Sequence, residues 1–441
     1  MSERDWSTRS AWTFLIGEYL AVNAIRDAYM LVEGPDCVHL KTQFVQGNHD
    51  WMSTLTSVSG HHRVANTALH PVQMARSREE VILEVLRRIA THPATGGVLM
   101  TAMPMAAVTG ADYDGMCKVV AGESGKPVVQ VPGRSLGGDW LDGYAEALAA
   151  LARRLDLPAG RADPRKVALV GYLCDRNEGD HRANLRDLRA LVSALDLDVC
   201  SVWLENQAFA DLAAVAEAAT IVSLPYGRKA ATWVAKRTGA RVVECDVPLG
   251  PSATERLVRA VASATGRESL AEARIEAELA RCVPPLEWVV PFVFQDRVVG
   301  FVGDPHLAAG VADVVELLGA RLAFAALTGR EAHCAAARSV LAGRAAVLEN
   351  PRAQKLADFL ESSVVADPID LLVTNEAAVN LLPDVARIEL GFPSLYRHEL
   401  YDRPYLGFGG FLALASDMAN ALRRQDAARG RAAGYRLREG G

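Results

Sequence analysis

Short apolar runs alternate with longer amphipathic stretches through the middle of the chain. Apolar runs typical of buried strands occupy residues 166–172, 199–203 and 220–224. Stretches with apolar residues at helical spacing separate and follow them, at residues 184–195 and 209–218 and from Lys229 onward. Because strands alternate with helices, the pattern predicts βαβ units and a parallel sheet that helices cover on both faces.

The same alternation continues on both sides of this middle unit. In the first part of the chain we expect a helix at residues 12–27, a strand that ends at Gly34-Pro35, a helix at 78–91, and strands at 97–100 and 127–131. In the last part, a strand at 298–304 ends in a Gly-Asp turn, and a helix begins at Pro305. Further strands are expected at residues 322–326, 345–348, 370–374 and 386–390.

Proline and glycine gather in residues 155–164, which is typical of a domain boundary. The chain then divides into domains at residues 1–160, 165–286 and 287–441, the last with a C-terminal helix. The predicted fold class is α/β. It comprises three Rossmann-like domains, each a mostly parallel sheet flanked by helices, around a central cleft.

Length, charge and cysteine usage narrow the class of protein. At 441 residues, 50% of them hydrophobic, the chain is long enough for about two to four domains with sizeable cores. A net charge of −6 and a pI near 6.0 argue against a nucleic-acid partner. Seven cysteines without paired spacing suit a reducing compartment. The first residues carry no signal pattern and no uncharged apolar run is long enough to span a bilayer, so we expect a cytoplasmic protein without membrane contact.

One thiol, Cys37, follows the strand that breaks at Gly34-Pro35. Open α/β folds place ligands at the carboxyl edge of the sheet, where this loop is expected, so Cys37 is a candidate metal ligand. The alternative is that Cys37 packs as a small apolar residue, as free cysteines usually do. Packing roles are predicted for the other cysteines, which are Cys117, Cys174, Cys200, Cys245, Cys282 and Cys334.

A long polar loop at residues 43–70 follows Cys37. Loops of this length inside a compact domain are usually functional or mobile. Its candidates for contact with a substrate or cluster are His49, Asp50, His61, His62 and His70, and the alternative for each histidine is simple solvation. We single out His49 as a candidate catalytic residue.

Charged residues follow two strands of the predicted second domain. Asp175-Arg-Asn-Glu-Gly-Asp-His181 lies between a strand and a helix, so it should face the carboxyl edge of the sheet, and His181 is a candidate catalytic residue. The alternative is a helix cap with solvated charges. Tyr226 and Arg228 occupy an analogous edge and are candidates to bind an anionic group of a cofactor, with a surface role as the alternative.

Aromatic and basic residues concentrate in residues 392–408, among them Arg397, His398 and Arg403. Such a segment can line a pocket for a planar anionic molecule, which makes His398 a third catalytic candidate, or it can pack against the domain below. Nucleotide chemistry is not expected on this chain. The glycine-containing stretch at residues 122–127 lacks P-loop spacing and has Pro127 where serine or threonine must coordinate magnesium.

Several segments spread along the chain resemble, in order and spacing, segments of the nitrogenase component 1 family. The stretch from Ile25 to Cys37 is similar to the strand that leads to that family's cluster cysteine in HGPxGC, with Glu33 where histidine is common. Thr101-Ala-Met-Pro104, followed by Gly110-Ala-Asp112, is similar to the TCxxxxxGDD segment. Residues 170–180 resemble the opening strand of the family's second domain, and residues 388–393 and 403–409 resemble its closing segment.

The chain departs from the family at most ligand positions. Members with a full set use three cysteines per subunit in the first domain, and this chain matches only the middle one, Cys37. The upstream position falls near residues 7–11, and the downstream position is Ala102, which cannot bind metal. Members that hold the large catalytic cofactor carry a further cysteine in the second domain, where residues 221–228 contain none. The resemblance therefore implies no molybdenum-type cofactor held by this chain.

The resemblance implies one subunit of a nitrogenase-like reductase with an unequal ligand set. Iron-sulfur clusters normally need four protein ligands, so a 4Fe-4S or larger cluster would be shared between Cys37 and a homologous component 1-type subunit. The reductase that makes chlorophyll precursors in the dark is built in this way. Electrons would come from a homodimeric, ATP-dependent iron-sulfur reductase. A small-molecule substrate would lie in the cleft among the domains, contacted by some of His49, His181, Tyr226, Arg228 and His398.

Two other classes of function stay open. One is a scaffold on which a metal cofactor is assembled, which would hold its cargo without turning it over. The other is a non-redox protein that has lost the cluster and binds a small molecule between its Rossmann-like domains. Steady-state reduction of a small molecule with the partner reductase would distinguish an enzyme from a scaffold. The colour of the purified complex would distinguish a protein that holds the cluster, which is brown, from one that has lost it.

Overall fold

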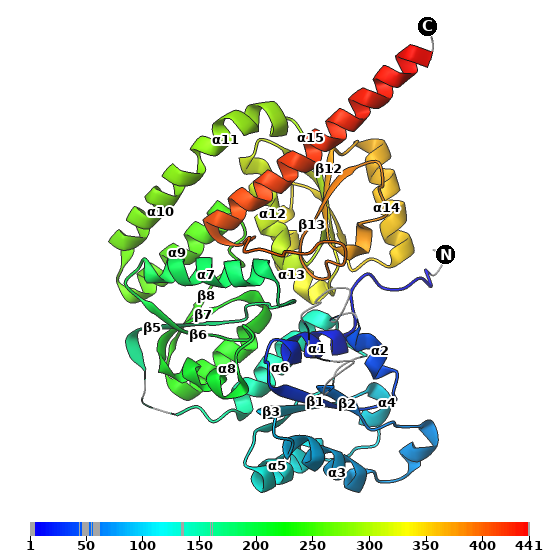
Figure 1. The fold of residues 1–441 in the computed structure, drawn as a ribbon, viewed down its shortest axis with the longest axis vertical. Coiled ribbons are helices and arrows are strands. Elements are labelled where there is room, and N and C mark those ends of the chain that lie inside the picture. Colours follow the sequence, from blue (N-terminus) through cyan, green and yellow to red (C-terminus); the bar gives the residue numbers. More distant parts are fainter. Residues whose placement is uncertain are drawn as a thin grey trace.

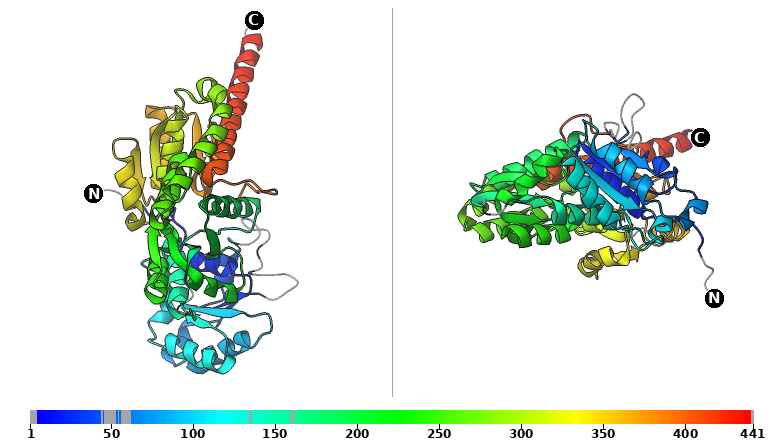
Figure 2. Two further views of the ribbon diagram at one scale, coloured as in Figure 1. Left: turned by 90° about the vertical axis from the view of Figure 1, so that its left-hand side faces the viewer. Right: turned by 90° about the horizontal axis from the view of Figure 1, so that it is seen from below.

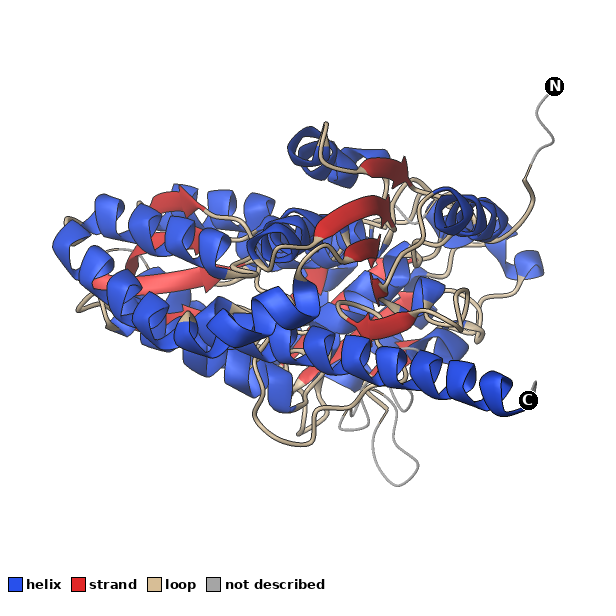
Figure 3. Cartoon of the chain, turned by 90° about the horizontal axis from the view of Figure 1, so that it is seen from above, coloured by secondary structure: helices blue, strands red, loops and turns tan. Residues whose placement is uncertain are grey.

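Three parallel sheets, one after another along the chain, form the framework of the protein (Figure 1). The computed structural model describes residues 5–43, 62–133, 136–158 and 162–439, together with residues 45, 53, 55 and 160. Helices enclose the strands of all three sheets (Figure 3). The predicted α/β fold class with three mostly parallel, helix-flanked sheets is therefore confirmed. None of the described helices combines the length and apolarity that a bilayer span requires.

The first sheet has the strand order β2-β1-β3-β4. Its strands are β1 (Ala28–Glu33), β2 (Val64–Asn66), β3 (Gly97–Ala102) and β4 (Val128–Gln130). The helices α1 (Phe14–Asn23) and α6 (Trp140–Arg154) cover one face, and α3 (Glu79–Ala90) and α5 (Tyr113–Ser124) cover the other. Successive residues of β1, such as Leu31 and Val32, belong to the two different cores, which explains why the strand is apolar throughout.

Two glycines let α1 and α6 approach closely. A Cβ on Gly17 would lie 1.8 Å from the carbonyl oxygen of Trp140, and a Cβ on Gly143 would lie 1.9 Å from that of Phe14. All residues of α1 are buried, because α6 and β1 pack against it. The helix predicted at residues 12–27 is therefore the shorter α1, which is buried on every side as a core helix should be.

The second sheet has the order β6-β5-β7-β8. Its strands are β5 (Asp163–Val170), β6 (Asp198–Val202), β7 (Ala218–Ser223) and β8 (Arg241–Glu244). Its helices are α7 (Gly179–Ser193), α8 (Arg228–Thr238), α9 (Pro251–Thr265) and α10 (Glu268–Cys282). The helix predicted at residues 209–218 is a 3-10 helix, η2 (Phe209–Glu217).

The third sheet has the order β11-β10-β9-β12-β13. Its strands are β9 (Val298–Gly303), β10 (Arg321–Leu327), β11 (Ala346–Glu349), β12 (Leu371–Thr374) and β13 (Ala386–Glu389). Its helices are α11 (Pro284–Val289), α12 (Pro305–Leu317), α13 (Glu331–Leu341), α14 (Ala353–Ala366) and α15 (Gly407–Glu439). The last turns of α15 project beyond the rest of the molecule (Figure 2).

The carboxyl edges of the three sheets meet in the interior. Residues that follow β3 and β4 line the same hollow as Lys229, which lies beyond β7, and Arg330, which lies beyond β10. Tyr172, which follows β5, lines the same cavity as Asp304, which follows β9. Since ligands of open α/β folds lie at carboxyl edges, this meeting place and the Cys37 loop are the candidate ligand sites.

Candidate functional site

Cys37 lies on the surface at the carboxyl edge of the first sheet. β1 ends at Glu33, and Cys37 takes the N-cap position of the short helix α2 (Val38–Thr42), where its thiol is exposed. Glu33 is the register partner of Ala102 across β1 and β3, so the loop that carries Cys37 begins directly beside Ala102. The two positions that resemble cluster ligands therefore come from adjacent strand ends, and one of them offers only a methyl group.

The described residues around Cys37 offer too few donor atoms for a whole cluster. The imidazoles of His39 and His62 lie near the loop with ring centroids 6.3 Å apart, and burial and His62 both lower the pKa of His39. Residues 8–10 hydrogen-bond to the third domain, since Ser10 N–H donates to the Pro351 carbonyl at 3.1 Å. No group of three described ligand-type residues that could hold a metal includes Cys37. Because a cluster needs about four ligands, a second subunit would have to supply the others.

The other cysteines have the predicted packing positions. Five of them are buried and Cys200 is partly buried. Burial raises the pKa of the Cys117 thiol to about 12 and that of Cys245 to about 11, which keeps both protonated at neutral pH.

His181 is buried in the first turn of α7 between two polar partners. Its Nδ1 lies 2.6 Å from the Tyr172 hydroxyl, and its Nε2 bonds to the Asp175 carboxylate. Burial lowers the pKa of His181, but the carboxylates of Asp175 and Asp180 raise it by more, so the net pKa is above the ordinary value. The imidazole can hold a proton here, yet it is only 2% exposed.

His398 lies on the other side of the same loop. Its Nδ1 is 2.6 Å from Glu178 Oε1, while Glu178 Oε2 accepts a hydrogen bond from the Glu399 backbone N–H at 2.7 Å. The two segments singled out in the sequence, residues 175–181 and 392–408, are therefore packed on each other. The charges of the first segment are not solvated, because Arg176 and Asp180 form a buried ion pair with an N–O distance of 2.6 Å.

Tyr226 and Arg228 do not converge on a common point. The Tyr226 hydroxyl donates to Asp304 Oδ2 at 2.6 Å, across the boundary between the second and third sheets. The Arg228 guanidinium donates to the backbone carbonyls of Ser223 and Cys245. Burial raises the pKa of Asp304 to about 6, although the Tyr226 hydrogen bond lowers it.

Tyr172, Asp175, Tyr226, Asp304 and Tyr405 line one buried cavity of about 20 Å³. This volume holds about one water molecule, and a neighbouring cavity, lined by Asp175, Arg176 and Gly391, measures about 40 Å³. Side chains therefore fill most of the space between the carboxyl edges of the second and third sheets. His49, the remaining catalytic candidate, lies outside the described residues.

A larger hollow, of about 450 Å³, lies where all three sheets meet. Two ion pairs stand in its wall: Lys229 Nζ lies 2.6 Å from Glu146 Oε1, and Arg330 Nη1 lies 2.8 Å from Asp142 Oδ2. None of these four residues was predicted as a site residue, because each belongs to a helix or helix start and its partner is distant in the chain. The hollow has the size of a small-molecule site.

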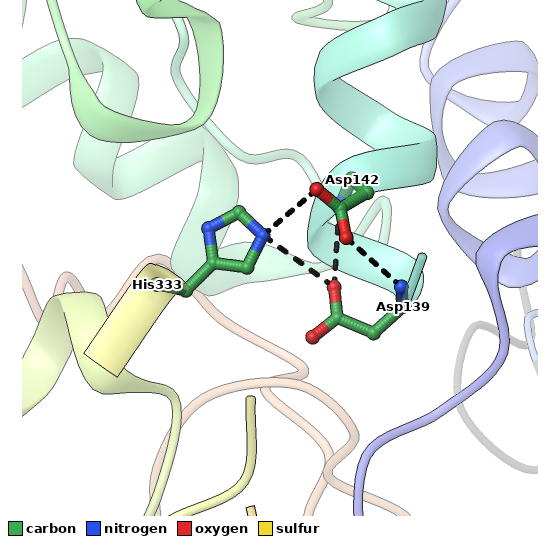
Figure 4. A group of neighbouring side chains, drawn as sticks. All are labelled: Asp139, Asp142 and His333. Atoms are coloured by element: carbon green, nitrogen blue, oxygen red, sulfur yellow. Dashed lines mark hydrogen bonds and ion pairs between the residues drawn. The ribbon is translucent and has the colours of Figure 1, made fainter. Parts of the chain in front are cut away.

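Asp139, Asp142 and His333 form a compact group beside this hollow (Figure 4). His333 Nε2 lies 3.2 Å from Asp142 Oδ1 and 3.6 Å from Asp139 Oδ1, which joins α13 to the start of α6. The two aspartates also form the capping box of α6, and Arg330 donates from its backbone N–H to Asp139 and from its guanidinium to Asp142. Since His333 and Arg330 already balance both carboxylates, the group is a cluster of ion pairs that ties α13 to the start of α6. The signal of this group in the sequence is the D-x-x-D helix-capping pattern at residues 139–142.

The comparisons with known proteins agree with this fold. The family model described as Nitrogenase component 1 type Oxidoreductase matches residues 14–423. A nitrogenase molybdenum-iron protein beta chain from Frankia alni is 26% identical over 199 residues, which cover 44% of this chain and 37% of that protein. The solved structure titled Nitrogenase Cp1 at pH 6.5 superposes with a TM-score of 0.81 at 16% identity, covering 96% of this chain and 95% of that one. The structure titled Nitrogenase Cp1 at pH 5 gives 0.71 at 12% identity, covering 96% and 90%. The family match extends over nearly the whole chain, and the chain belongs to the nitrogenase component 1 type oxidoreductase family.

Proposed function

We propose that this chain is the ligand-poor subunit of a nitrogenase-like reductase. In this proposal it pairs with a homologous component 1-type subunit and works in the cytoplasm. A homodimeric, ATP-dependent iron-sulfur reductase would supply the electrons, and Cys37 would be one ligand of the iron-sulfur cluster, shared between the subunits, that receives them. The single observation that carries the proposal is the exposed thiol of Cys37 at a carboxyl edge, beside an alanine at the neighbouring ligand position.

Each part of the proposal assigns a task to residues of this chain. Cys37 gives one thiolate, and its exposure lets a second subunit approach with the remaining ligands. The cluster, when bound, would store and release single electrons. The hollow of about 450 Å³ receives a small-molecule substrate. Lys229, Arg330, Asp142 and Glu146 would exchange their ion pairs for polar groups of that substrate, and His181, Tyr226 and His398 would keep the surrounding edges in position.

The test uses the chain coexpressed with its partner subunit and purified without oxygen. Cys37→Ala should copurify with the partner but lose iron and fail to reduce substrate when the reductase and ATP are added. Cys117→Ala is the matched control, since it also removes one thiol, from the buried core beside Met100. Normal turnover by Cys37→Ala would overturn the ligand assignment, and loss of iron in the control would mean that the ligand has been misplaced.

A non-redox binding protein is the second candidate, and the methyl group at Ala102 favours it. If no cluster is present, the complex will be colourless and its iron content negligible, while the hollow remains able to bind a small molecule. A brown complex with a paramagnetic signal that changes in Cys37→Ala excludes this candidate.

A further inference from the structure

A second hollow, of about 400 Å³, lies on the outside of the third domain. It is bordered by β13, the edge strand of the third sheet, by the segment between β13 and α15, and by the first half of α15 (Figure 1). Four arginines line it, together with Tyr401: Arg387 from β13, Arg397 and Arg403 from the connecting segment, and Arg424 from α15.

Two of these arginines are fixed by acids of the hollow. Asp417 lies 2.7 Å from Arg397 and 2.5 Å from Arg403, one carboxylate oxygen for each guanidinium. Arg397 also bonds to Glu399 through its Nε at 2.6 Å. Asp417 thus bridges the two guanidiniums, and these charge-assisted hydrogen bonds hold this wall of the hollow in place.

The other two arginines have no such partner. Arg387 and Arg424 are exposed, and neither makes an ion pair or a side-chain hydrogen bond with another described residue. The third acid of the hollow, Glu389, is turned to the connecting segment, where its Oε2 accepts from the Ser394 hydroxyl at 2.9 Å and from the Tyr396 N–H at 3.2 Å. Two unpaired guanidiniums thus border one hollow whose acids are already engaged.

We propose that this hollow binds a small molecule that carries carboxylate or phosphate groups. Arg387 and Arg424 hold its oxyanions by charge-assisted hydrogen bonds, and Tyr401, whose hydroxyl lies 3.4 Å from Arg403, supplies an aromatic wall. The volume lies within the range of small-molecule sites. The site involves neither Cys37 nor the hollow among the three sheets, and of the residues given a role in the proposed function it contains only His398. It therefore goes beyond the proposed reductase function and is tested separately.

Calorimetric titration of the full chain with pyrophosphate and, in a second arm, with citrate tests the proposal and distinguishes the two sources of oxyanion. We expect saturable binding of at least one probe, weakened about tenfold or more by Arg387→Gln and by Arg424→Gln, since one charge-assisted bond is worth about one factor of ten. Arg423→Gln is the matched control. Arg423 precedes Arg424 in α15, carries the same charge and is also exposed, but it does not line the hollow. It should change binding less than twofold.

Two outcomes would overturn the proposal. One is the absence of saturable binding for both probes at low ionic strength. The other is an equal weakening by Arg423→Gln and Arg424→Gln, which would mean diffuse attraction to a basic helix. Circular dichroism confirms that the variants are folded, and Cys37→Ala should bind the probe as the wild type does, because the two sites do not touch.

Discussion

Ionisation of Asp304 should destabilise the protein at neutral pH, and Asp304→Asn should remove that loss. The side chain is 1% exposed, and its two oxygens accept hydrogen bonds from the Tyr226 hydroxyl at 2.6 Å and the His306 N–H at 2.8 Å. Burial raises its pKa to about 6, whereas the unfolded chain has a value of about 3.9. The folded state therefore binds this proton more tightly, so the stabilising contribution is complete below about pH 3.9 and is lost as the pH rises through about 6.

The size of the effect follows from the two pKa values. A difference of about two units corresponds to about 3 kcal/mol of lost stability at pH 8, and about half of that loss falls between pH 5 and pH 8. Asparagine cannot ionise, but its amide oxygen still caps α12 as the Asp304 carboxylate does. Tyr226→Phe should act in the opposite direction: it removes a hydrogen bond to the ionised form, worth about 1.5–3 kcal/mol, so it harms the protein more at pH 8 than at pH 5.

Denaturant midpoints for the wild type, Asp304→Asn and Tyr226→Phe at pH 5 and pH 8, followed by tryptophan fluorescence, measure these differences. Other titrating groups are common to all three proteins, so the difference between wild type and variant isolates Asp304. The reasoning is wrong if Asp304→Asn loses as much stability as the wild type between the two pH values.

Gly143→Ala should lower the free energy of unfolding by about 1–3 kcal/mol, because the new methyl would overlap the Phe14 carbonyl oxygen in the α1–α6 contact. The control is Gly122→Ala: Gly122 lies in α5 with open space around it, so this substitution should raise the free energy of unfolding by about 0.5–1 kcal/mol. Equal effects of the two substitutions in thermal melts would contradict the packing argument. His333→Gln should flatten the pH dependence of stability. Burial lowers the pKa of His333, but Asp142 and Asp139 raise it by more, so the folded-state pKa lies above the unfolded value of about 6.5. The stability that His333 contributes is therefore complete below about pH 6.5 and is lost as the pH rises through the folded-state pKa. If the denaturant midpoint of this variant changes between pH 5 and pH 9 as much as that of the wild type, the ion pair does not contribute as described.

The sheets could be predicted because their strands are buried on both faces. Val167, Ile221 and Phe301 lie in continuous apolar runs that are bounded by glycine, proline or charged residues, and these runs became β5, β7 and β9. β8 (Arg241–Glu244) was missed because it is short, charged at both ends and only partly buried. β2 (Val64–Asn66) was missed because it lies within the polar stretch at residues 43–70.

The polar interior could not be predicted from local patterns. Tyr226 and Asp304 are 78 residues apart, and Arg330 and Asp142 are 188 residues apart. Each of these side chains follows a strand or begins a helix, where a solvated residue is equally compatible with the sequence. Only the packing of the second sheet on the third, and of α13 on α6, brings the partners together.

The packed interior between the sheets limits where a ligand can bind. In open α/β folds the carboxyl edge of a sheet is the usual ligand site, but the two cavities found between the second and third sheets measure only about 20 and 40 Å³. Tyr172, His181 and Asp175 hydrogen-bond to one another, as do Tyr226 and Asp304. A ligand would have to break such buried hydrogen bonds to enter, and each bond to a charged group costs about 1.5–3 kcal/mol. Three places lie outside this packed edge: the exposed thiol of Cys37, the three-sheet hollow with its paired charges, and the arginine-lined hollow beside β13. The ligand roles that we propose for them therefore leave its buried hydrogen bonds intact.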